Sequence, residues 1–312
     1  MIPGSVVVPE EGTRFQRHLV LTAADGRYAM CRWPGSRRPT PFRRPGPVAR
    51  ARLAQLAVSR PTGSAPGADF GGEGRLIPAE PDPPGSRYVV DHYESVAATI
   101  LDTHGAGVDR FVPACHMAGL LLAELHRLAP DGFPDALPPG VNRLRNFLTT
   151  GGASHRTLRA AALILTALGH ERWGTLSNWC ERLVHDERRV VSHGAPGLAC
   201  LVLGPADDGV QFLIGDDLGA APWYWDIGWL LGELTELRHV LGTPATDPTW
   251  ARLESTLLAG YGRDQLAVRR TAVLRIVLHL HDYAAYADWD EAEIGRYQAL
   301  LTELIDRVRE EE

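Results

Sequence analysis

The sequence predicts an α+β fold with two lobes, a small β-rich N-terminal lobe and a larger, mainly helical C-terminal lobe. Short β-prone segments separated by turn residues are concentrated in residues 1–93. Apolar residues recur at helical spacing through most of residues 94–312, and one β-hairpin interrupts them. Strands followed by helices, without regular alternation, are typical of an α+β protein.

The hairpin expected at residues 18–33 is the clearest element of the N-terminal lobe. Two β-prone stretches flank Asp25 and Gly26, a residue pair that favours a tight turn. The other expected elements are a strand at 4–9, a helix at 45–58, a loop rich in Gly, Pro and Ser at 59–74, and strands at 75–78 and 88–93. Together they predict a small sheet with one helix.

The C-terminal lobe is expected to be helical apart from one hairpin. Helices are predicted at 111–128, 141–150, 155–168, 172–187, 227–241, 248–261, 266–287 and 290–310. The hairpin pairs 197–203 with 210–215, because a turn-forming stretch at 205–209 separates these two β-prone runs. Trp223, Tyr224, Trp225 and Trp229 are expected in the core, and one of them could instead line a ligand pocket.

Composition excludes several classes of protein. The net charge of −6 gives no general reason to expect nucleic-acid binding, and no run of about 18 apolar residues predicts a membrane span. The four cysteines stand singly, which favours reduced thiols and a cytoplasmic protein. All 32 residues counted as Lys+Arg are arginine, so any chemistry that needs a lysine amine is excluded.

Three segments, in order, resemble motifs of the aminoglycoside and choline phosphotransferases. Residues 120–128 are similar to a leucine-rich helix of that family that ends in Leu-His-x-Leu. Residues 190–197 resemble its His-Gly-Asp catalytic loop, and residues 215–228 resemble its metal-binding segment and the Trp-Asp stretch that follows. The resemblance implies a kinase-like fold with a nucleotide cleft between the lobes, and it implies ATP and Mg²⁺ as cofactors if the site is functional.

The resemblance places the expected catalytic loop at 190–203, but two of its functional positions are replaced. His193 and Gly194 fit the pattern, whereas Ala195 stands where the family has its aspartate base. A methyl group cannot accept a proton or orient a hydroxyl. Family spacing from His193 puts Cys200 at the metal-binding asparagine, and a thiol is a poor ligand for Mg²⁺.

The metal-binding segment, 213–226, leaves two alignments open. Counting back from Asp226 puts the family's metal aspartate at Ile214, whereas a shift of two residues puts Asp216 there. Asp216 and Asp217 are the carboxylate pair that could hold a metal, or they could belong to a solvated turn or a helix cap. Asp226 is expected to cap the following helix and to fix the catalytic loop.

The phosphate-binding cation of the family is a lysine on the third strand, which this chain cannot supply. Arg32 and Arg27 are the candidates, with Cys31 occupying the position in one register. An arginine can hold phosphate through two nitrogens, but it is wider than a lysine amine and not equivalent to it. The helix at 45–58 carries no acid to pair with the cation.

Arginine is concentrated in the N-terminal lobe. Residues 27–60 hold nine arginines and no Asp or Glu, in a chain whose net charge is negative. The proline-rich segment 36–45 is expected to be extended and exposed. Its arginines are predicted to bind an acidic ligand or partner, or else to form a solvated face: Arg37, Arg38, Arg43 and Arg44.

Two functions follow from this pattern. In the first, the chain is a pseudokinase-like binding or scaffold protein that binds a peptide, a small molecule or a partner enzyme. In the second, it is an atypical phosphotransferase that moves the ATP γ-phosphate to a hydroxyl of a Ser/Thr peptide or small molecule, with Asp216 or Asp217 holding Mg²⁺. Related divergent kinase-like proteins act beside lyases in the biosynthesis of modified peptides, which implies a natural-product setting and a peptide ligand by analogy.

Overall fold

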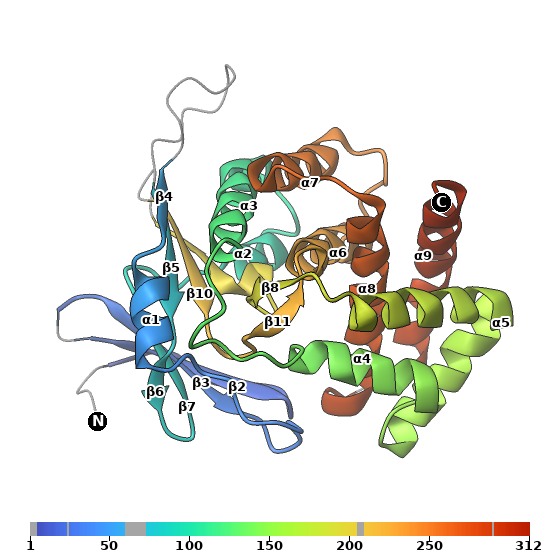
Figure 1. Ribbon diagram of the computed structural model, residues 1–312, viewed down its shortest axis with the longest axis horizontal. Coiled ribbons are helices and arrows are strands. Elements are labelled where there is room, and N and C mark those ends of the chain that lie inside the picture. Colours follow the sequence, from blue (N-terminus) through green and yellow to red (C-terminus); the bar gives the residue numbers. More distant parts are fainter. Residues whose placement is uncertain (1–4, 24, 60–72, 205–208, 289) are drawn as a thin grey trace.

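The computed structural model describes residues 5–23, 25–59, 73–204, 209–288 and 290–312. Figure 1 shows a β-rich N-terminal part beside a larger helical part, with the C-terminus on the helical side. This arrangement confirms the predicted α+β class. Most of the loop expected at 59–74, with Arg60, and the tip of the hairpin turn at 205–208 lie outside the described residues.

A five-stranded antiparallel sheet forms the N-terminal part, in the order β1-β2-β3-β7-β6. Its strands are β1 (Val6–Gly12), β2 (Gln16–Thr22), β3 (Tyr28–Pro34), β6 (Glu80–Asp82) and β7 (Gly85–Val90). The predicted hairpin is therefore β2–β3. In the pairing of β3 with β7, Arg32 lies opposite Ser86. Both faces of the sheet are covered along residues 29–32 of β3, and Arg32 is 8% exposed.

A second sheet joins two strands of the N-terminal part with two strands from the middle of the C-terminal part, in the order β4-β5-β10-β9. Its strands are β4 (Ala57–Ser59), β5 (Glu73–Pro78), β9 (Leu201–Leu203) and β10 (Val210–Ile214). Strand β10 runs parallel to β5, so the hairpin predicted in the helical lobe is tied to the N-terminal part. The prediction of a helix through residue 58 was wrong, because α1 (Pro47–Ala54) ends early and β4 pairs with β5.

The predicted helices of the C-terminal part are confirmed, with one addition. They are α3 (Val112–Leu125), α4 (Pro139–Thr150), α5 (His155–His185), α6 (Tyr224–Val240), α7 (Pro248–Tyr261), α8 (Leu266–Tyr286) and α9 (Glu291–Glu310). The two helices predicted within α5 meet at Gly169, whose positive φ of 78° interrupts the helical backbone. The sequence analysis missed α2 (Val96–Asp102) and the short strand pair β8 (Arg189–Ser192) and β11 (Gly219–Pro222).

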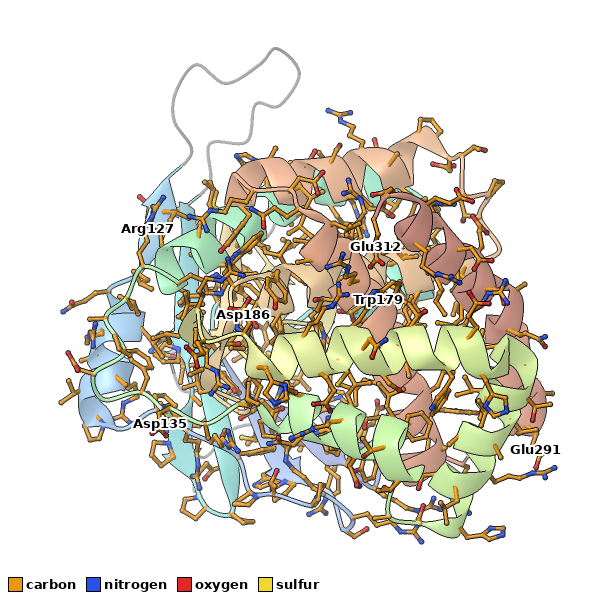
Figure 2. All side chains as sticks on the ribbon, turned by 45° about the vertical axis from the view of Figure 1, so that its right-hand side comes forward. Arg127, Asp135, Trp179, Asp186, Glu291 and Glu312 are labelled. Carbon is orange, nitrogen blue, oxygen red and sulfur yellow. The ribbon has the colours of Figure 1, made fainter. Side chains whose placement is uncertain are left out.

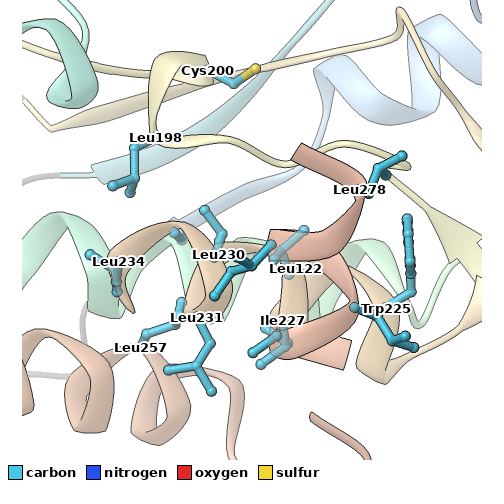
Figure 3. Packing of buried hydrophobic residues seen from close by; sticks show 14 of the residues in the cluster. Leu122, Leu198, Cys200, Trp225, Ile227, Leu230, Leu231, Leu234, Leu257 and Leu278 are labelled. Carbon is cyan, nitrogen blue, oxygen red and sulfur yellow. The ribbon is translucent and has the colours of Figure 1, made fainter. Parts of the chain in front are cut away.

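The C-terminal core is built around α6, which packs against α8 and α7. Figure 3 shows Leu230 and Leu234 of α6 in one buried cluster with Leu122 of α3 and Leu257 of α7. All four side chains are buried. Burial of each such side chain contributes roughly 1.5–3 kcal/mol, so this core holds α6 and the segments attached to it in place.

The C-terminal residues contact α5 through a hydrogen bond and an ion pair. Figure 2 shows Trp179 on α5 and Glu312 at the end of the chain. The Trp179 indole nitrogen donates a hydrogen bond of 2.8 Å to the Glu312 carboxylate. Nearby, Arg172 of α5 forms an ion pair of 2.7 Å with Asp306 of α9. In the part of the chain that the structure describes, no helix is long and apolar enough to cross a membrane.

Candidate functional site

Asp226 organises the segment that corresponds to the catalytic loop. It is fully buried in the first turn of α6. Its carboxylate accepts hydrogen bonds from Ser192 Oγ at 2.9 Å, His193 N at 2.8 Å and Gly194 N at 3.0 Å. The expectation that Asp226 fixes this loop therefore agrees with the geometry, but the expected helix cap was wrong, because α6 begins at Tyr224 and its N-cap residue is Trp223.

His126, which the sequence analysis did not single out as a site residue, completes this arrangement. Its Nε2 lies 2.9 Å from the Asp226 carboxylate and its Nδ1 lies 2.8 Å from the Tyr261 hydroxyl. Burial alone would raise the pKa of Asp226, but the hydrogen bond and charge of His126 lower it below its ordinary value. The signal was present in the sequence, because His126 is the histidine of the leucine-rich motif.

The backbone at Gly194 brings the loop close to the metal-segment residues. Gly194 has a positive φ of 91°, and a Cβ placed there would lie 1.9 Å from the carbonyl oxygen of Asp217. A glycine is therefore required at this position both by conformation and by space. The indole nitrogen of Trp225 donates to the Gly194 carbonyl at 2.9 Å, which holds the loop from the other side.

The two positions at which the sequence analysis expected the aspartate base and the metal-binding asparagine line one cavity. Its volume is about 220 Å³, and both Ala195 and Cys200 are among its lining residues. Burial raises the pKa of the Cys200 thiol, which favours the neutral form. Neither a methyl group nor a neutral thiol supplies a base or a hard metal ligand at these positions.

Arg32 lies in the same cavity and forms an ion pair with Asp216. Its Nη1 is 3.4 Å from the Asp216 carboxylate and 3.6 Å from Cys200 Sγ, and its Nη2 donates to the Ala199 carbonyl at 3.3 Å. The guanidinium also lies over the ring of Tyr88, 5.2 Å from the centroid. The arginine predicted as phosphate cation is thus fully engaged with protein groups.

The two alignments of the metal segment can be compared directly in space. Ile214 ends β10 and is fully buried in the sheet. Gly215 then turns the chain with a φ of 132°, and Asp216 lines the cavity beside Arg32. The alignment that is shifted by two residues assigns Asp216, whose carboxylate lines the cavity. The direct count assigns Ile214, which is not among the lining residues.

Asp217 is neutralised by a second arginine, Arg38. The pair is in direct contact, and the Arg38 side chain has no exposed surface. Its guanidinium lies over the rings of both Phe15 and Phe42, 4.3 and 4.4 Å from their centroids. A charge desolvated in this way needs a paired counter-charge, so Arg38 and Asp217 depend on each other.

The expectation of an exposed arginine-rich segment at 36–45 was wrong for most of its length. The Arg43 amide donates to the Asp216 carbonyl at 2.9 Å, and the Arg43 side chain donates to the Leu137 carbonyl at 2.6 Å. Arg44 donates to the Gly85 carbonyl at 2.8 Å. The segment is packed against the metal-segment residues because its side chains find intramolecular partners, and only Arg37 of the four arginines is exposed.

Arg27, the other candidate for the phosphate cation, lies in the turn of the β2–β3 hairpin. Its guanidinium forms an exposed ion pair with Asp25 at 2.7 Å. It is not among the residues that line the cavity. The structure therefore places Arg32 and Asp216 together and leaves Arg27 apart from them.

The turn between β1 and β2 contributes Phe15 to the lining of the cavity. The ring of Phe15, at this turn, packs on Tyr286 at the end of α8 with 4.8 Å between centroids. Arg14 donates its amide to the Tyr286 carbonyl at 3.2 Å, and its side chain pairs with Asp288 at 2.6 Å. These contacts join the N-terminal sheet directly to the C-terminal helices.

The floor of the cavity comes from three helices and is charged. Trp229 and Glu233 of α6, Arg275 of α8 and the Arg143–Asp282 pair of α4 and α8 line it. The sequence analysis left open whether one of the aromatic residues near 225 lines a pocket, and Trp229 does. It missed the charged residues, because none of them belongs to a sequence motif and only the packing of the helices brings them together.

Buried His193 predicts a loss of stability in mild acid. Its Nε2 donates to the Leu213 carbonyl at 2.8 Å, and burial lowers the pKa of His193 from its ordinary value of 6.5. The unfolded chain therefore takes up a proton first, and stability falls as the pH drops below about 6.5, by at most about 1.4 kcal/mol per pH unit. Urea unfolding between pH 7 and pH 5 measures how the free energy of unfolding changes with pH. This change should be smaller in His193→Asn than in the original protein. The exposed His155→Asn variant should keep the full slope, and equal slopes in both variants would contradict this role.

Comparison with solved structures establishes the fold. The amicoumacin kinase hAmiN, solved with AMP-PNP, Ca²⁺ and Ami, has a TM-score of 0.54 and 15% identity, covering 96% of this chain and 88% of its own. The ethanolamine kinase of Plasmodium vivax has a TM-score of 0.54 and 11% identity over 96% and 82% of the two chains. A microcompartment-associated aminopropanol kinase has a TM-score of 0.53 and 14% identity over 99% and 93%.

This chain has the aminoglycoside phosphotransferase and choline kinase-like fold. No protein-family model and no curated protein matches its sequence. At identities of 11–15% the similarity to this kinase-like fold concerns architecture, so the chemistry must be judged from the side chains in the cleft.

Proposed function

We propose that this protein is a kinase-fold binding protein that does not transfer phosphoryl groups. The observation that carries the proposal is the pairing of both metal-segment carboxylates with arginines, Asp216 with Arg32 and Asp217 with Arg38. A metal-bound triphosphate needs free carboxylate oxygens for the metal and a free cation for the phosphates. Each arginine instead supplies the positive charge that the carboxylate would otherwise take from a metal ion.

The residues of the cleft do not fit a Mg²⁺–triphosphate as they are arranged. The hAmiN structure contains AMP-PNP and Ca²⁺, which motivates the test for nucleotide and metal here. In this chain the metal amide is replaced by Cys200, and the cavity of about 220 Å³ is below the roughly 300–1,000 Å³ of pockets for drug-sized ligands. The proposed role is to hold a peptide or small molecule, or to assist a partner enzyme, in the cytoplasm and in the biosynthesis of a modified peptide.

One observation favours the atypical phosphotransferase as a second candidate. Asp216 lines the cavity, and its Oδ1 accepts no hydrogen bond from a described residue. If a ligand separated Asp216 from Arg32, the carboxylate could take a metal ion and the arginine a phosphate group. This candidate requires the Asp216–Arg32 pair to open, whereas the binding protein does not.

Thermal unfolding with ATP, with and without Mg²⁺, separates the two candidates. The binding protein should show no magnesium-dependent rise in Tm. A functional nucleotide site at 100 times its Kd would add about 2.7 kcal/mol, which is a rise of several degrees for a chain of this size. Such a rise, lost in Asp216→Asn, would overturn the proposal in favour of the phosphotransferase.

A further inference from the structure

The β1–β2 turn lies between the cavity and the surface of the protein. Phe15 lines the cavity of about 220 Å³, and its neighbour Arg14 lines a separate groove of about 750 Å³. The groove is open to solvent, because the side chain of Asp288 in its lining is 88% exposed. Displacement of the turn would therefore join the cavity to the groove.

The contacts that hold this turn against the end of α8 lie at the surface. The Arg14 amide donates to the Tyr286 carbonyl at 3.2 Å, and the Phe15 ring packs on the Tyr286 ring. The Arg14 side chain donates to the Ala287 carbonyl at 3.2 Å and forms an ion pair of 2.6 Å with Asp288. An exposed ion pair contributes little to stability and is screened by salt, so it can open readily.

Other contacts between the N-terminal and C-terminal parts are harder to break. Strand β5 pairs in parallel with β10 along residues 74–78, which ties the two parts into one sheet. Arg38, whose side chain has no exposed surface, pairs with Asp217. Local release of a surface turn costs less than the rupture of a sheet and of a buried ion pair. Release of the β1–β2 turn is therefore the easier way to open the cavity.

Phe15 packs on two guanidinium groups whose hydrogen bonds are incomplete. Those of Arg38 and Arg143 lie 4.3 and 4.6 Å from the centroid of its ring. In each of them the buried Nη1 makes no hydrogen bond to a described residue. A buried donor without an acceptor is destabilising, and water that enters when the ring moves away would supply the acceptor. This gain offsets part of the cost of exposing the Phe15 ring.

We propose that the β1–β2 turn is a latch that controls entry to the cavity, with Arg14 holding it against the end of α8 and Phe15 blocking the way in. This regulation rests on the proposed function, because it treats the cleft as a place where a ligand binds. The latch is closed in the structure. Loss of the ion pair between Arg14 and Asp288 opens it more often and leaves the rest of the chain folded.

The reaction of Cys200 with N-ethylmaleimide measures opening of the latch. Cys200 lines the cavity, whereas Cys115 and Cys180 are buried away from it and report unfolding of the helical part. Peptide mass spectrometry gives the rate at each cysteine. Arg14→Ala should raise the rate at Cys200 by about 5- to 30-fold, because it removes the ion pair and a hydrogen bond. Asp288→Asn removes only the charge and should raise it by about 2- to 5-fold.

Arg17→Ala is the matched control, because Arg17 forms an exposed ion pair with Glu10 within the same hairpin. It should leave the Cys200 rate within about twofold of the original. Sodium chloride should raise the rate in the original protein towards that of Asp288→Asn and should change the variant little.

Two results would overturn the latch. One is an equal Cys200 rate in Arg14→Ala and Arg17→Ala. The other is a rise at Cys200 that Cys115 and Cys180 share, since it would show global unfolding and not local opening. Neither nucleotide nor magnesium is present in this experiment, so a failure of the latch is distinguishable from a failure of the proposed function in the ATP experiment.

Discussion

Replacing Asp226 by asparagine is expected to lower the free energy of unfolding by about 3–5 kcal/mol. The fully buried carboxylate accepts hydrogen bonds from one side chain and two backbone amides, and it lies 2.9 Å from His126 Nε2. An asparagine has one acceptor oxygen, so its amide nitrogen must face donors that it cannot satisfy. Equilibrium unfolding in urea measures the change.

Asp247→Asn is the matched control for this prediction. Asp247 is the N-cap of α7, where its carboxylate accepts from the amides of Thr249 and Trp250. Asparagine caps a helix about as well as aspartate, so this variant should remain within about 0.5 kcal/mol of the original. If the two variants have the same unfolding midpoint, the hydrogen bonds between Asp226 and the loop do not stabilise the protein as predicted.

The helical part was largely predictable because its signals are local. Apolar spacing defines α7 and α8 within the chain itself, and both were predicted to within a residue or two. Strands β8 and β11 were missed because each is only four residues long and is stabilised by the other, whose paired residues lie 27 or more positions away in sequence. A short strand has no periodicity of its own, so only its pairing partner identifies it.

In the candidate site, too, residues within one continuous segment could be predicted, and residues brought together from distant segments could not. Ala195 and Cys200 could be assigned from motif spacing, because the loop is continuous in sequence. The alternatives Arg32 and Arg27 could not be separated, because the sequence did not show that β3 begins at Tyr28, which leaves Arg27 in the turn and Arg32 within the strand. The burial of Arg38 depends on Phe15 and Asp217, which lie in other parts of the chain, so composition alone suggested an exposed arginine.

Arg38→Ala is expected to lower the free energy of unfolding by about 3–5 kcal/mol, because it leaves the Asp217 carboxylate buried without its partner. The neighbouring exposed residue gives a control of the same type, since Arg37→Ala should change stability by at most about 0.5 kcal/mol. Urea unfolding of both variants measures the difference. Similar behaviour of Arg38→Ala and Arg37→Ala would show that the ion pair contributes little.

The double variant Arg38→Ala/Asp217→Ala shows whether the loss comes from the unpaired charge. If it does, the double variant should be more stable than the sum of the two single losses predicts, with a coupling of about 1–3 kcal/mol. Strict additivity would instead assign the loss to the packing of the guanidinium between Phe15 and Phe42. The distinction bears on function, because only a strong Arg38–Asp217 pair would oppose a metal ion that competes for the same carboxylate.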